Sequence, residues 1–134
     1  MVQYAIQLKK KLNCAGGFIK LFDCNLDQNN LFGGSPYLLQ FGPNKCGSNK
    51  EITANLFHEG KKYEIQQSTV EPLDDGNTHF YTFIIHPNSS YDILIDGKSV
   101  LNGSLTSGWN VYGGYSIIAL LMMLFVLLLT DVIS

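Results

Sequence analysis

Phe18 and Lys20 are the first residues whose types and spacing could support a binding chemistry. In a strand, residues two positions apart point to the same side, so this aromatic ring and this ammonium group would share one face. Such a face suits a sugar, whose C–H groups stack on the ring while its hydroxyls bond to polar groups. The same pair also occurs on ordinary β-sheet surfaces, so spacing alone leaves both interpretations open.

The three cysteines, Cys14, Cys24 and Cys46, offer a second chemistry. A bridge between Cys14 and Cys46 would close a loop of roughly 30 residues and stabilise the fold by about 3–4 kcal/mol. Three cysteines allow three pairings, and two free, buried cysteines are the alternative.

Other reactive side chains do not form a recognisable catalytic or metal-binding set. His58, His79 and His86 lack the spacing of metal ligands. Asp74 and Asp75 precede a glycine and read as a solvated turn. We therefore expect neither an enzyme nor a metal site.

The charge balance excludes one class of partner. Nine Lys and Arg residues against eleven Asp and Glu give a net charge of −2, so the chain lacks the basic face that nucleic-acid binding needs. Residues 1–6 do not have the apolar core of a signal peptide.

Short alternating segments separated by turn residues position these side chains and predict an all-β sandwich. Asp96-Gly97 is the best hairpin turn. The expected strands span residues 2–8, 17–22, 37–41, 51–57, 62–66, 79–86, 91–95 and 99–101. The 79–86 segment is apolar on both faces, as expected of a strand in the middle of a packed sheet.

The composition changes at Val111. Ile117 to Thr130 is an almost unbroken apolar run without a charge. Extended back to Val111 it reaches about 20 residues, the minimum for a membrane span. Residues 111–134 therefore read as an apolar tail, either a transmembrane helix in contact with a membrane or a buried helix.

Three segments resemble the globular lectin domain of the calreticulin/calnexin family: Cys14 to Phe22 (CAGGFIKLF), Phe41 to Gly47 (FGPNKCG) and Thr78 to Pro87 (THFYTFIIHP). The resemblance implies that residues 1–110 are a partial lectin domain. The implied fold is an incomplete, concanavalin-like jelly-roll β-sandwich, which the apolar helix would follow.

The resemblance also implies a carbohydrate site. Phe18 stands where the family has a tyrosine that contacts the glucose-terminated glycan. The family's lysine two positions later is retained here as Lys20, and a later tyrosine of the family is retained as Tyr37. Asn44 replaces an aspartate of the site, and Cys14 and Cys46 match its disulfide. Gly34 replaces a second aspartate, and Gln40 replaces a methionine.

The implied function is that of an endoplasmic-reticulum chaperone that binds unfolded glycoproteins through their monoglucosylated N-glycans. Calcium is implied for the family, although its ligands are not identifiable in this chain. Because amides accept more weakly than carboxylates, Phe18, Gly34 and Asn44 predict weakened glycan binding. The alternative is a truncated, non-functional fragment with a hydrophobic tail.

Overall fold

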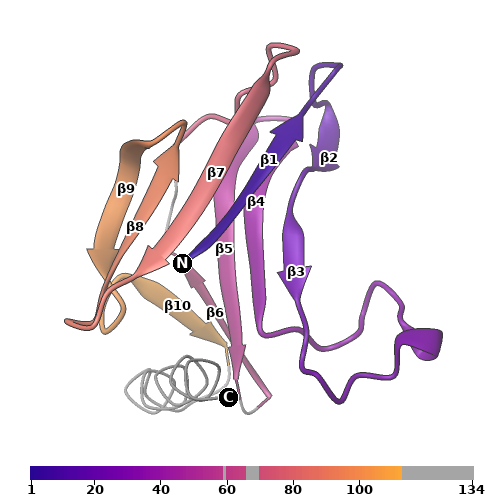
Figure 1. Ribbon diagram of the computed structural model, residues 1–134, viewed down its shortest axis with the longest axis vertical. Coiled ribbons are helices and arrows are strands. Elements are labelled where there is room, and N and C mark those ends of the chain that lie inside the picture. Colours follow the sequence, from indigo (N-terminus) through magenta and orange to yellow (C-terminus); the bar gives the residue numbers. More distant parts are fainter. Residues whose placement is uncertain (59, 66–69, 113–134) are drawn as a thin grey trace.

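The computed structural model describes residues 1–58, 60–65 and 70–112, which form two antiparallel β-sheets packed face to face (Figure 1). The four-stranded sheet has the order β1-β7-β8-β9. Its strands are β1 (Val2–Gln7), β7 (Thr78–Ile85), β8 (Ser90–Ile95) and β9 (Lys98–Ser104).

The six-stranded sheet has the order β10-β6-β5-β4-β2, and β3 also pairs with β4. Its strands are β2 (Cys14–Gly16), β3 (Ile19–Leu21), β4 (Leu39–Cys46), β5 (Asn49–His58), β6 (Lys61–Ile65) and β10 (Trp109–Tyr112). A 3₁₀ turn, η1 (Gln28–Asn30), lies in the long connection between β3 and β4.

The core lies between the sheets and is rich in aromatic rings. Strand alternation sends every second side chain inward, as in β8, where Tyr91, Ile93 and Ile95 are buried. Phe41 of the six-stranded sheet lies 5.6 Å from Phe83 of the four-stranded sheet, between ring centroids. Contacts of this kind hold the two sheets together.

The predicted all-β sandwich is confirmed, with differences in its strands. β4 runs on to Cys46, whereas the expected strand ended at residue 41. β2 and β10 were not among the expected strands, and β10 pairs with β6 through Val111 and Tyr63. The expectation for residues 79–86 was wrong in part, because Phe80 is 49 % exposed on the outer face. β7 is central within its sheet, but only one side of that sheet is covered by the core.

The expected apolar tail, with its helix or membrane span, covers residues 111–134. Val111 and Tyr112 lie in β10 instead, and residues 113–134 lie outside the described residues. Within the described part of the chain, no helix has the length and apolar character needed to cross a membrane.

Candidate functional site

The outer face of the six-stranded sheet carries a continuous row of polar side chains. Strand pairing places Lys20 of β3 opposite Gln40 of β4, and Gln40 opposite Asn55 of β5. Glu64 of β6 and Asn110 of β10 extend the row, because Asn55 pairs with Glu64 and Glu64 with Asn110. Paired residues point to the same side of a sheet, so the row crosses the sheet from β3 to β10.

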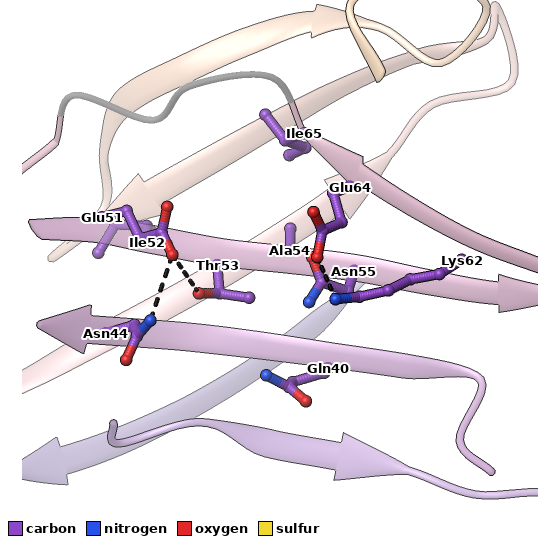
Figure 2. Close-up of a pocket in the computed structure, with 10 residues that line it drawn as sticks. All are labelled: Gln40, Asn44, Glu51, Ile52, Thr53, Ala54, Asn55, Lys62, Glu64 and Ile65. Carbon is purple, nitrogen blue, oxygen red and sulfur yellow. Dashed lines mark hydrogen bonds and ion pairs between the residues drawn. The ribbon is translucent and has the colours of Figure 1, made fainter. Parts of the chain in front are cut away.

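The middle of this face is hollowed, with a volume of about 230 Å³ (Figure 2). Pockets for drug-sized ligands begin at roughly 300 Å³, so the hollow suits one small polar unit. Its polar lining consists of Gln40, Asn44, Glu51, Thr53, Asn55, Lys62 and Glu64. These residues, together with Lys20 and Asn110, are called the polar face below.

Polar and apolar side chains alternate along β5, so the polar ones line the hollow and the apolar ones lie beneath it in the core. Glu51, Thr53 and Asn55 point outward, while the residues between them are buried in the core. Sequence reasoning identified the strand but not this polar face. The period-two pattern of residues 51–56 is the signal that could have found it.

The hollow contains opposite charges and neutral amides. Lys62 and Glu64 form an ion pair two residues apart on β6. Partial burial works to lower the pKa of Lys62, but the hydrogen bond and the charge of Glu64 outweigh it, so the pKa is raised. Glu51 accepts hydrogen bonds from Asn44 Nδ2 at 3.2 Å and from Thr53 Oγ1 at 3.5 Å.

Two of the predicted sugar-contacting residues, Lys20 and Tyr37, lie together at the β3 side of the polar face. Lys20 Nζ is 4.9 Å from the centroid of the Tyr37 ring. It also donates a hydrogen bond to the Gly33 carbonyl at 3.3 Å, so the loop that carries Gly34 lies beside this ammonium group. Both contacts hold Lys20 next to Gln40, its partner in the register.

Phe18 and Asn44 lie farther along the same face. Phe18 follows β2 and is 39 % exposed. A Cβ atom built on Gly16 would come within 2.2 Å of the Phe18 ring, so the ring covers this glycine. Because Gly16 pairs with Asn44, the exposed ring and the Asn44 amide share one side of the sheet.

A disulfide bond between Cys14 and Cys46 closes the rim beside these residues. The two cysteines are opposite in the β2–β4 register, with their Cα atoms 3.9 Å apart. This bond fixes β2, and therefore the start of the segment that carries Phe18, against β4. Cys24 is free and exposed.

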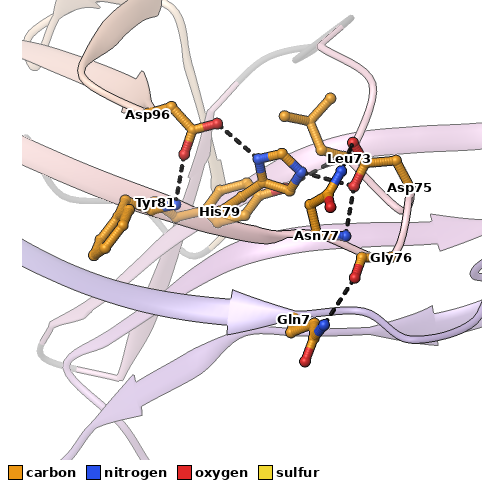
Figure 3. A network of polar contacts seen from close by, with 9 residues as sticks. Gln7, Leu73, Asp75, Gly76, Asn77, His79, Tyr81 and Asp96 are labelled. Atoms are coloured by element: carbon orange, nitrogen blue, oxygen red, sulfur yellow. Dashed lines mark hydrogen bonds and ion pairs between the residues drawn. The ribbon is translucent and has the colours of Figure 1, made fainter.

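A second polar network lies at one end of the four-stranded sheet (Figure 3). The His79 ring is held between two carboxylates, with Nδ1 2.7 Å from Asp96 Oδ2 and Nε2 2.9 Å from Asp75 Oδ1. Hydrogen bonds to Asp96 and then Asp75 raise the pKa of His79. Bonds from the Asn77 backbone and from His79 lower the pKa of Asp75 to about 2. Through these contacts the network ties the turn at Asp75 to the start of β7 and the end of β8.

The resemblance implies calcium for the family, and a carboxylate-rich calcium site is not found among the described residues. Calcium takes about six to eight oxygen ligands, several of them carboxylates. Within residues 1–58, 60–65 and 70–112, no group of three or more His, Cys, Asp or Glu side chains is placed to hold a metal ion.

An antiparallel sandwich with an aromatic-bordered polar face and a disulfide at its rim has the architecture of a lectin-type binding domain. The model of the calreticulin family matches residues 1–111, so the chain belongs to the calreticulin family. The resemblance drawn from the three sequence segments is thereby confirmed.

Curated relatives and a solved structure agree with this assignment. The chain is 39 % identical over 111 residues both to calreticulin of Drosophila melanogaster and to calreticulin-3 of Homo sapiens. The alignments cover 82 % and 83 % of this chain but only 27 % and 29 % of those proteins. The globular domain of T. cruzi calreticulin matches with a TM-score of 0.73 at 32 % identity, over 80 % of this chain and 40 % of that one.

Proposed function

We propose that this chain is a calreticulin-type lectin module of the endoplasmic-reticulum lumen, which binds unfolded glycoproteins through their monoglucosylated N-glycans. The observation that carries this proposal is the polar row from Lys20 to Asn110, bordered by Phe18 and Tyr37. The sandwich would then be part of a concanavalin-like jelly roll. Its role would be binding rather than catalysis.

The proposed mechanism is reversible capture of one sugar unit in the hollow. Phe18 is exposed and can stack on the C–H face of a sugar ring. Lys20 has three N–H donors and can bind a hydroxyl while it stays over Tyr37. The amides of Gln40 and Asn44 can each donate and accept, as sugar hydroxyls do.

The affinity should be lower than that of a site with carboxylates at positions 34 and 44. Gly34 has no side chain to contribute, and the Asn44 amide already donates to Glu51. Each lost hydrogen bond costs about 1 kcal/mol or more, and 1.4 kcal/mol is tenfold in affinity. We therefore expect millimolar rather than micromolar dissociation constants.

Ligand-observed NMR titration of the full chain with monoglucosylated oligomannose tests this proposal. A Lys20→Ala variant should weaken binding by about tenfold, because it removes a charged donor. Lys98→Ala is the matched control, since Lys98 is an exposed lysine on β9 of the other sheet. Absence of binding by the unmodified chain, or an equal loss in both variants, would contradict the proposal.

A further inference from the structure

The hollow contains two carboxylates, which differ in the charge of their hydrogen-bonding partners. Glu64 is paired with the Lys62 ammonium group on its own strand. Glu51 is contacted by neutral donors, the Asn44 amide and the Thr53 hydroxyl. Within the described residues, no Lys, Arg or His nitrogen lies at ion-pair distance from Glu51. Glu51 therefore keeps an uncompensated charge at the wall of a polar hollow.

The neutral donors also fix the position of this carboxylate. Asn44 and Glu51 are opposite each other in the β4–β5 register, and Thr53 is the next outward residue on β5. Both contacts are to the same oxygen, Oε1. No donor of a described residue contacts Oε2, so this oxygen can accept hydrogen bonds from a ligand.

A carboxylate held in this way selects for a hydroxyl-rich neutral ligand. An ionised carboxylate has about four acceptor positions and forms charge-assisted hydrogen bonds, roughly twice as strong as neutral ones. Vicinal hydroxyls of a hexose supply two donors side by side. The amides of Gln40, Asn44 and Asn55 line the same hollow and can satisfy the remaining hydroxyls.

We propose that Glu51 is the carboxylate that binds vicinal hydroxyls of a hexose, with Asn44 holding it in position. The inference rests on the lectin function proposed above and deepens it. The site thus retains a negative charge although position 44 holds an amide, because the charge lies on the neighbouring strand. An anionic sugar would be repelled by Glu51, so the ligand class is a neutral hexose.

The first test is the Glu51→Gln variant of the full chain, titrated by NMR with monoglucosylated oligomannose. Glutamine preserves the shape and can still accept from Asn44, but it removes the charge. Binding should weaken about ten- to a hundredfold, the range for a lost charge-assisted bond. Glu71→Gln is the matched control, because Glu71 is an exposed glutamate outside the hollow that pairs with Lys50. It should leave binding unchanged.

The second test exchanges the amide at position 44 of β4 and the carboxylate at position 51 of β5. Asn44→Asp alone places two carboxylates opposite each other and is the reference for the double variant. Asn44→Asp combined with Glu51→Gln restores one amide and one carboxylate in reverse order. Binding should then recover to within about threefold of the unmodified chain. Thermal melts monitored by circular dichroism establish that each variant is folded.

The outcomes separate this inference from the function on which it rests. An unmodified chain that does not bind overturns both. An unmodified chain that binds, with Glu51→Gln no weaker than Glu71→Gln, overturns the role of Glu51 and leaves the lectin proposal standing. If Glu51→Gln does not fold, the double variant decides, because restored binding supports the role and absent binding overturns it.

Discussion

At the scale of single residues, the two polar clusters differ in whether their groups can still bind a ligand. In the His79 network both ring nitrogens and both carboxylates already have protein partners. In the hollow, Glu51 and the amides of the polar face line a space open to a ligand. The first cluster therefore contributes to stability, and the second carries the proposed binding.

The His79 network makes the stability of the protein depend on pH. The folded-state pKa of His79 is raised above its usual 6.5, so its contribution is complete below pH 6.5 and is lost as the pH rises through the raised value. The folded-state pKa of Asp75 is lowered to about 2, so its contribution is lost as the pH falls from about 4 toward 2. The network should stabilise the fold most between about pH 4 and 6.5.

Melting temperatures of the unmodified chain and of His79→Asn, measured at pH 5 and pH 8, check this prediction. Between pH 5 and pH 8, the melting temperature of the unmodified chain should fall by more than that of His79→Asn. Asp96→Asn should reduce the same difference, because Asp96 is the main cause of the raised His79 pKa. An equal change in all three proteins would contradict the assignment.

The residues of the site were only partly predictable. Spacing placed Phe18 and Lys20 on one face, and the family resemblance gave them a role and added Tyr37 and Asn44. The structure places all four around the six-stranded sheet, with their sugar contacts still a prediction. Glu51 was missed, because its partner Asn44 is seven residues away and only the β4–β5 register brings the two together.

At the scale of elements, β4 organises the site because β2, β3 and β5 all pair with it. The alternating pattern predicted most of the strands. It did not predict β2, which has three residues, or β10, whose apolar residues Val111 and Tyr112 were assigned to the tail. Both are short strands whose existence depends on long-range pairing, which local patterning does not encode.

Gly42 shows how closely β4 is packed. Its φ of +144° favours glycine, and an added Cβ would lie 2.0 Å from Tyr4 Oη and 2.7 Å from the Phe18 Cα. Gly42→Ala should lower the free energy of unfolding by about 2–4 kcal/mol, through steric overlap and backbone strain. Urea denaturation measures this change. Gly33→Ala is the control, since a Cβ at Gly33 meets nothing within 4 Å and should leave stability almost unchanged.

The disulfide should contribute to stability through the unfolded chain. Cys14 and Cys46 are 32 residues apart, so replacing both with serine should reduce the free energy of unfolding by about 3–4 kcal/mol. Urea denaturation under oxidising conditions checks this value. Cys24→Ser, which removes only an exposed free thiol, should have no effect. A double variant as stable as the unmodified chain would show that β2 is held by its backbone pairing alone.

At the scale of the whole molecule, the unpaired edge strands of the sheets can bring copies of the chain together. Among the described strands, β1 and β9 are the outer strands of the four-stranded sheet. An outer strand presents unpaired backbone donors and acceptors, which can pair with another chain. The exposed Phe80 lies opposite Ala5 of β1 and adds apolar surface near this edge. The molecule therefore has the features of a protein that self-associates through β1.

We expect the chain to be poorly soluble and to associate as its concentration rises. Ala5→Lys should reduce this association, because a charge on an edge strand disfavours the addition of another strand. Ser107→Lys is the matched control: it adds the same charge in an exposed turn between β9 and β10 and should not reduce association. Size-exclusion chromatography with light scattering measures the mass of each variant. If the unmodified chain is a monodisperse monomer at all concentrations, the edges are protected, and both the association and the non-functional fragment interpretation are wrong.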